Sequence, residues 1–290
     1  MTDPHTARWE PLGKVRAQDL VEARHHAHFA VQWPSRIARA FLPARADDSQ
    51  ASLLCEHALG GLFTAAIPRG DAAIRAGVRI RDLTLVFTDG DGRALVEYAI
   101  HGRSDAGVGG IVNAALREFG LDPARLPRAL PYEMPEHALA AGGRYDAEAH
   151  GVALRELSRY FGNFDPLLRH VAAHEAGAGP VYTWPHHFDM ASLILLGDDA
   201  EASPQIGVGL SPGDGNYAEP YLYVSVWPRI DDAGALPELP APAFWHTADF
   251  LMAVLQGSDM AGLDGSAVAA IVSAAVSGAR AGLEALGGQG

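Results

Sequence analysis

The chain has 290 residues, of which 48% are hydrophobic and 20% are charged, and its 22 basic and 35 acidic residues give a formal net charge of −13. This composition is typical of a globular protein rather than of a disordered chain. An excess of negative charge disfavours binding to nucleic-acid phosphates and to anionic lipid, so we expect neither nucleic acid nor membrane as a partner.

The cysteine content and the first residues indicate a cytoplasmic protein. Cys55 is the only cysteine, so no intrachain disulfide can form, as expected in a reducing compartment. The sequence begins without the basic and apolar regions of a signal peptide. No uninterrupted run approaches the roughly 18 apolar residues that a membrane helix needs.

The first half of the chain predicts helices around a strand hairpin. Apolar and polar residues alternate over 78–87 and again over 94–101, and the Asp89-Gly-Asp-Gly segment between them is a strong hairpin signal. A calcium loop is excluded because Arg93 occupies its fifth position. The other elements predicted here are a helix over 17–42 with a break or kink at Pro34, strands within 51–67, and a helix over 107–119 that ends at Gly120.

Residues 121–145 are rich in Pro and Gly and predict a connector between two halves, 1–120 and 146–290. Beyond it, a helix from about 146 is expected to restart at Asp165-Pro166, where Asp is a good N-cap and Pro suits the first helical position. The remaining predicted elements are strands over 181–197, 204–210 and 218–227, a linker from 236, and helices over 243–256 and 265–286.

These elements predict an α+β fold, with mostly antiparallel sheets covered by helices and a helical pair at the C-terminus. The two halves are expected to share one continuous core. Trp33-Pro34 and Trp184-Pro185 occupy similar places in the two halves. A distant internal duplication is therefore one interpretation.

The densest group of potential ligands lies in the segment Trp184-Pro-His-His-Phe-Asp. If residues 186–190 are extended, His187 and Asp189 share one face, and His186 lies on the other. Imidazole and carboxylate together suit a divalent transition metal such as zinc, iron or manganese, or a general base with its orienting carboxylate. The pair is equally consistent with hydrogen-bonded strand residues that bind nothing.

The predicted strand over 218–227 places Glu219, Tyr221, Tyr223 and Trp227 on one face. Such an aromatic, amphipathic face is typical of a pocket wall, although it could equally pack beneath a helix.

The loop before this strand contains Asp214 as a further candidate ligand-binding residue. It also contains Gly209-Leu-Ser-Pro-Gly, which matches the nucleophile pattern G-x-S-x-G. Since Pro212 and a strand follow Ser211 instead of a helix, we expect a turn between strands, not a nucleophile elbow.

Two other places in the chain carry histidines of interest. His246 follows the Pro-rich linker among aromatic residues, and it is the most plausible fourth group for a site formed by His187, Asp189 and Glu219. The segment Arg24-His-His-Ala-His28 is predicted to be a polar surface of its helix.

Several of these motifs, in the same order, resemble an uncharacterised bacterial family known as domain of unknown function 5996. The resemblance lies in 28–43, in the Thr-x-x-Ile-Pro exit at 64–68, in Trp184-Pro-His-His-Phe-Asp-Met-Ala, in Gly209-Leu-Ser-Pro-Gly with Glu219-Pro-Tyr-Leu-Tyr, and in 243–246. Asp189 and Glu219 match the family pattern, whereas His186 and His187 depart from it. The resemblance implies a bacterial cytoplasmic protein and supplies no reaction.

The sequence thus leaves three hypotheses. The first is a small-molecule enzyme, with or without a metal, in which His187, Asp189 and Glu219 are ligands or acid–base groups. The second is a non-catalytic protein that binds a small ligand or a partner through the face formed by Tyr221, Tyr223 and Trp227. The third is that these polar residues are purely structural. Substrate, metal and oligomeric state stay open.

Overall fold

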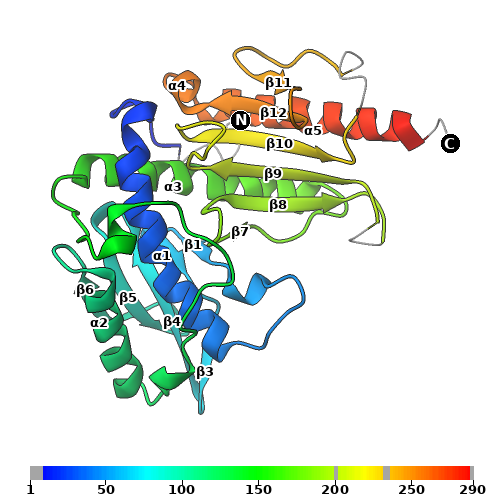
Figure 1. Cartoon of the computed structure of the whole chain (residues 1–290). Coiled ribbons are helices and arrows are strands. Elements are labelled where there is room, and N and C mark those ends of the chain that lie inside the picture. The colour runs from blue at the N-terminus through cyan, green and yellow to red at the C-terminus, as the bar shows by residue number, and fades with distance from the viewer. Residues whose placement is uncertain (1–8, 199–201, 231–235, 288–290) are drawn as a thin grey trace. The chain divides into compact units, whose positions relative to one another are not determined.

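A computed structural model describes residues 9–198, 202–230 and 236–287, and it confirms the α+β class with two antiparallel sheets and helices at the C-terminus (Figure 1). The chain divides into two compact units. Unit 1 contains residues 1–18, 159–181 and 189–290, and unit 2 contains residues 19–158 and 182–188. The expected connector, 121–145, lies in unit 2. The proposed duplication stays a prediction.

The sheet of unit 2 has the strand order β1-β2-β4-β5-β6, with β3 also pairing β4, and all of these pairs are antiparallel. The strands are β1 (Leu54–Glu56), β2 (Gly61–Phe63), β3 (Ile67–Arg69), β4 (Ala72–Arg79), β5 (Thr84–Asp89) and β6 (Ala94–Ala99).

The predicted hairpin is confirmed as β5 and β6, and Gly90 and Asp91 at its tip are exposed. The single strand predicted over 78–87 is wrong, because a 3-10 turn at Ile80–Asp82 separates β4 from β5. Leu83 completes this turn with φ +49°. Apolar alternation continues across the turn because both strands bury side chains in the same core, so the pattern alone does not reveal the turn.

Helix α1 (Val21–Phe41) packs against β4 and is continuous through Pro34, so the helix is not broken there. It also packs against α2 (Asp105–Glu118), whose N-cap is Ser104. The two helices approach closely because Gly109 faces Trp33: a Cβ on this glycine would lie 2.7 Å from the indole ring. The same indole donates a 2.8 Å hydrogen bond to Asp105. Helix α1 is thereby fixed along most of its length.

Helix α3 (Gly151–His174) starts in unit 2 and continues into unit 1. The predicted restart at Asp165-Pro166 is wrong, because the helix runs through Pro166. Asp165 does not cap a helix. It is buried and accepts hydrogen bonds from Arg169, four residues later. A buried carboxylate that is satisfied by a side chain one turn away gives the same sequence signal as an N-cap.

The sheet of unit 1 has the strand order β11-β12-β10-β9-β8. The helix predicted over 243–256 is wrong, since these residues form β11 and β12. A short apolar run such as 251–255 fits a buried strand as well as a helix. The strands are β8 (Met190–Leu195), β9 (Gln205–Ser211), β10 (Tyr221–Trp227), β11 (Phe244–His246) and β12 (Met252–Gln256), and β7 (Tyr182–Thr183) is the short strand of unit 2 that precedes them.

The short helix α4 (Gly257–Met260) and the long helix α5 (Gly265–Gly287) end the chain. Residues 265–286 are long and apolar enough to cross a membrane by length and composition, a test that core helices also pass. In unit 1, α5 packs along β9 and β10 (Figure 1). It buries Val268, Ile271, Val272 and Val276.

Candidate functional site

The segment that sequence analysis favoured is not extended. Residues 185–187 form a turn, closed by a 2.7 Å hydrogen bond from the Phe188 amide to the Trp184 carbonyl. Phe188 has φ +60°, a left-handed conformation that is strained for an aromatic residue. Strand alternation therefore does not govern where His186 and His187 point, and the argument that paired His187 with Asp189 fails.

Helix α1 holds this turn in place through one carbonyl oxygen. The Nε2 of His28 donates to the Pro185 carbonyl at 2.8 Å, and the Gln32 amide donates to the same oxygen at 2.7 Å. The Phe188 ring is fully buried and stacks on the His28 imidazole. Burial lowers the pKa of His28 to about 4, so this imidazole is neutral near pH 7. These contacts with α1 fix the turn, in which His186 is half-buried and His187 is exposed.

The other predicted site residues belong to unit 1, where two tyrosine–aspartate pairs lie beside β10. The Tyr223 hydroxyl donates to Asp189 at 2.6 Å, and the Tyr221 hydroxyl donates to Asp214 at 2.6 Å. Burial, followed by the neighbouring carboxylate, raises the pKa of both tyrosines, so both stay protonated donors. These hydroxyls are engaged within the protein.

Glu219 is a structural carboxylate in this arrangement. It is buried and accepts from the Gln256 side chain at 3.0 Å and from the Ser258 hydroxyl and amide at 2.9 and 3.0 Å. These three donors satisfy its oxygens and connect the start of β10 to the end of β12. A carboxylate with this many donors is already stabilised without a cation.

His246 lies toward the other end of the same sheet. It pairs with Met252, four residues along β12 from Gln256, a separation of about 13 Å along a strand. Its Nδ1 is 2.7 Å from the Tyr217 hydroxyl, and its ring stacks on Phe250. Glu219 and His246 are therefore not brought together. Trp227 ends β10 with 48% of its surface exposed.

Ser211 ends β9 and is 5% exposed, and its hydroxyl accepts from the Gly213 amide at 3.1 Å. A loop and then β10 follow it. A nucleophile elbow requires a helix at this point, so the G-x-S-x-G match lacks its structural context.

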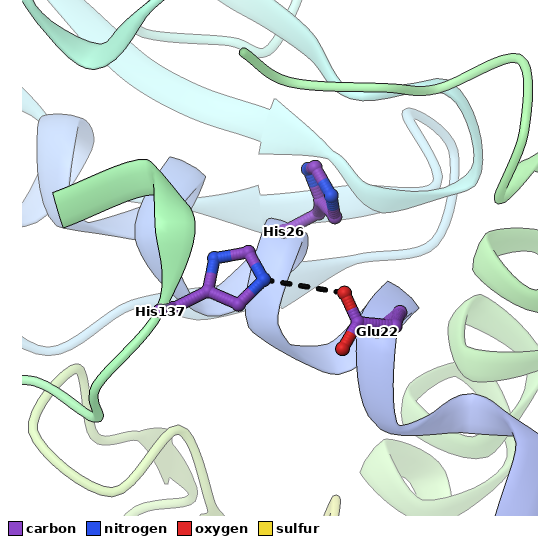
Figure 2. A group of neighbouring side chains, drawn as sticks. All are labelled: Glu22, His26 and His137. Atoms are coloured by element: carbon purple, nitrogen blue, oxygen red, sulfur yellow. Dashed lines mark hydrogen bonds and ion pairs between the residues drawn. The ribbon is translucent and has the colours of Figure 1, made fainter. Parts of the chain in front are cut away.

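A different group of ligands gathers in unit 2, at the start of α1. Glu22, His26 and His137 place one potential ligand atom each within 4.8 Å of one another (Figure 2). Glu22 and His26 are four residues apart on α1, hence on one face. His137 comes from the segment before the 3-10 helix Ala138–Ala141. Its Nε2 lies 3.2 Å from a Glu22 oxygen.

Burial differs among the three groups. His26 is 5% exposed, whereas the side chain of His137 is 11% exposed and that of Glu22 is 57% exposed. The hydrogen bond to His137 is the main cause that lowers the pKa of Glu22, so this carboxylate stays ionised. The cluster is therefore anchored in the protein on the histidine side and open to solvent on the glutamate side.

Further imidazoles surround this cluster. The His25 ring stacks on His137 with centroids 4.9 Å apart, and the His150 ring lies 4.8 Å from that of His26. Burial, and then the charges that His150 and His137 would carry, lower the pKa of His26 to about 4. Burial likewise lowers the pKa of His25. Both rings are neutral near pH 7, which is the form in which imidazole binds a metal.

Sequence reasoning missed this cluster because it interpreted 24–28 as a polar surface. That expectation is wrong: His26 and His28 are each 5% exposed. The spacing of Glu22 and His26 was a usable signal, since residues four apart share a helix face. His137 carries no such signal, because it lies 111 residues further along the chain, in the expected connector.

Comparison with known proteins gives no match to this chain among family models, curated proteins or solved structures. The resemblance to domain of unknown function 5996 stays a prediction. Function must therefore be argued from the geometry of the residues themselves.

Proposed function

We propose that this protein binds a divalent transition metal through Glu22, His26 and His137. The observation that carries the proposal is the convergence of these three ligand atoms within 4.8 Å. Two imidazoles and one carboxylate form a ligand set that suits zinc, iron or manganese. Three protein ligands leave a coordination position for water or for an oxygen atom of a substrate, as catalytic rather than structural sites do.

The distances are compatible with a small rearrangement. Two ligands bound about 2.0 Å from a tetrahedral ion lie about 3.3 Å from each other, and the His137 nitrogen and Glu22 oxygen are already 3.2 Å apart. His26 lies on the rigid helix α1, four residues from Glu22, so a change of side-chain rotamer at the exposed Glu22 would complete the set.

Metal binding would move a proton within His137. The His137 Nδ1 accepts from the Leu139 amide at 3.3 Å, which leaves the proton on Nε2, facing Glu22. A metal on Nε2 requires the proton to move to Nδ1 and this bond to be given up. At 3.3 Å the bond is at the weak end of its range. This shift between the two ring nitrogens releases no proton. At low pH, protonation of the imidazoles competes with the metal, so binding should weaken as the pH falls.

This proposal retains the metal-assisted form of the enzyme hypothesis but moves it to other residues. A bound ion would lower the pKa of a water molecule in its open position and would polarise a substrate oxygen. The His25 and His150 rings pack against the ligands and would fix their orientation. Asp189 and Glu219 have no part in this site, because each accepts hydrogen bonds from its own neighbours in unit 1.

The test is a titration of metal-depleted protein with Co²⁺, followed by its visible absorption and then by competition with Zn²⁺. We expect one ion per chain with the spectrum of a low-coordinate nitrogen and oxygen site. Glu22→Gln and His137→Gln should each weaken binding by about 100-fold, because each removes a direct ligand. Glu22 is 57% exposed, and glutamine keeps a polar side chain of similar length at the 11% exposed His137, so both variants should fold.

Two matched variants serve as controls. Glu148→Gln removes a carboxylate that is 84% exposed, and His187→Gln removes the exposed histidine that sequence analysis favoured. Neither should change Co²⁺ affinity. If His187→Gln abolishes binding while Glu22→Gln does not, the proposed site is wrong and the sequence-based one is preferred.

A further inference from the structure

Arg39, near the end of α1, has a guanidinium edge that makes no hydrogen bond within the described chain. Its Nη1 forms an ion pair with Asp48 at 2.5 Å. Its Nε and Nη2 are buried and have no hydrogen-bond partner among the described residues. These two nitrogens form the side-on fork with which arginine binds two oxygens of a carboxylate or phosphate. Burying such donors unpaired is costly, so the position requires an explanation.

The same place contains other unused or polar groups. Ser35, one turn before Arg39, is fully buried and its hydroxyl makes no hydrogen bond among the described residues. The Tyr132 hydroxyl donates to Gln32 at 2.7 Å. Burial raises the pKa of Tyr132, whereas the Arg39 charge and weak side-chain contacts of Ser35 and Arg39 with the Tyr132 hydroxyl lower it. Donors from α1 thus gather around the Tyr132 hydroxyl, without full hydrogen-bond geometry for Ser35 or for the Arg39 Nε and Nη2.

His186 completes this group from the turn that α1 holds. Its ring lies 5.7 Å from that of Tyr132. Burial lowers its pKa first, His187 lowers it further, and Asp48 and Arg39 are close enough to influence it. The strained turn at 185–188 therefore delivers an imidazole to the Arg39 neighbourhood, a use of backbone strain that is common at functional sites.

We propose that this neighbourhood is a binding site for a small oxyanion, a carboxylate or phosphate group, held by the Arg39 fork and the Ser35 hydroxyl beneath Tyr132 and His186. All of the groups named belong to unit 2, and the inference is independent of the metal site.

The charge balance favours an anion over a neutral occupant. Asp48 contacts only one guanidinium nitrogen and is 44% exposed on its side chain, so it offsets the buried charge weakly. Arg36, three residues before Arg39, also has a buried Nε without a partner among the described residues. A water molecule can accept from one or two of these donors but carries no charge, whereas an oxyanion matches the planar fork and neutralises it.

Access is through the partly open side of the site. The Arg39 side chain is 18% exposed, and His186 is half-buried beside the exposed His187. Gln32 and His28 fix the turn at Pro185, so we expect the backbone that carries His186 to stay in place when an anion binds.

The experiment is calorimetric titration with inorganic phosphate and, separately, with acetate, at constant ionic strength set by sodium chloride. The wild-type protein should bind one phosphate or acetate. Arg39→Lys keeps the charge but loses the fork, and it should weaken binding by about tenfold or more. Ser35→Ala removes a single buried hydroxyl and should weaken it several-fold. Arg81→Gln, at an arginine that is 48% exposed, is the control and should bind like wild type.

Circular dichroism checks that each variant is folded. If Arg39→Lys does not fold, Ser35→Ala still tests the site. A wild-type protein that binds neither anion would overturn the proposal and leave an internal water as the occupant. So would an affinity that neither Arg39→Lys nor Ser35→Ala changes. Preference for phosphate over acetate, or the reverse, identifies which oxyanion the site accepts.

Discussion

The Nε2 of His28 lies 2.8 Å from the carbonyl oxygen of Pro185, 157 residues later in the chain. Gln32, one turn further along α1, donates to the same oxygen. A carbonyl has two lone pairs, and here both are used by one helix. The turn that carries His186 and His187 is therefore fixed by α1, the helix that also carries Glu22 and His26 near its start and Arg39 near its end.

The first prediction concerns stability against pH. The pKa of His26 and of His28 is about 4 in the folded protein, compared with 6.5 for an ordinary histidine. The unfolded chain therefore binds protons more readily, so the stabilisation is complete above pH 6.5 and is lost as the pH falls toward 4. For the buried His28 the loss should reach about 3 kcal/mol over this range. Urea unfolding at a series of pH values measures it.

His28→Gln is the matched variant for this experiment. Glutamine can still donate to the Pro185 carbonyl but does not titrate, so its stability should fall less steeply between pH 6.5 and 4.5. Carboxylates titrate alike in both proteins, so the difference between the two slopes reports His28. A variant with the same slope as wild type would show that His28 is not responsible.

The second prediction concerns Gln32, which bridges Tyr132 and Pro185. Tyr132→Phe should cost about 1–2 kcal/mol, because it leaves the Gln32 oxygen unpaired in a buried place. Gln32→Ala should cost about 2–3 kcal/mol, since its bonds to Tyr132, Pro185 and the His28 carbonyl are all lost. The double variant should lose less free energy of unfolding than the sum of the two single losses, because both variants remove the same Tyr132–Gln32 hydrogen bond. Exposed Glu133→Gln is the control, and strictly additive costs would contradict the bridge.

The sequence predicted the fold class, the β5–β6 hairpin, α2 and the glycine that ends it, because local rules decide these features. Periodicity and turn chemistry are properties of neighbouring residues. Sequence reasoning failed where one hydrophobic pattern fits both a helix and a strand. The run 251–255 is apolar enough for a buried helix or a buried strand, and it is β12.

The candidate site was harder to predict because its residues are far apart in the chain. His137 meets Glu22 across 115 positions, and Tyr132 meets Gln32 across 100. The sequence indicated that the segment 184–189 is a candidate site, but it did not predict the turn that the segment forms. Phe188 has a left-handed conformation, and its ring stacks on His28 from another part of the chain. A contact of that kind has no signature in the local sequence.

The third prediction separates a structural carboxylate from a ligand. Glu219→Ala leaves the Ser258 amide and hydroxyl and the Gln256 amide without their acceptor. It should destabilise the protein by about 3 kcal/mol or more. Glu219→Gln keeps one acceptor oxygen and should cost less, and its Co²⁺ affinity should equal that of wild type. Weaker Co²⁺ binding in this folded variant would return Glu219 to the list of metal ligands.

The last prediction uses a glycine of the G-x-S-x-G match. Gly209 pairs with Tyr223 across β9 and β10, and a Cβ there would lie 2.5 Å from the Tyr223 ring and 2.8 Å from the Met190 carbonyl oxygen. Real Cβ atoms do not approach a backbone oxygen so closely, so Gly209→Ala must displace Tyr223 from Asp189. We expect a loss of about 2–3 kcal/mol in urea unfolding. Gly215→Ala is the control, because nothing lies within 4 Å of its Cβ position, and it should be neutral or slightly stabilising. If the ring is the obstacle, Tyr223→Leu should recover part of the loss in the Gly209→Ala background. A Gly209→Ala protein as stable as wild type would show that this glycine is not required for the Tyr223–Asp189 pair.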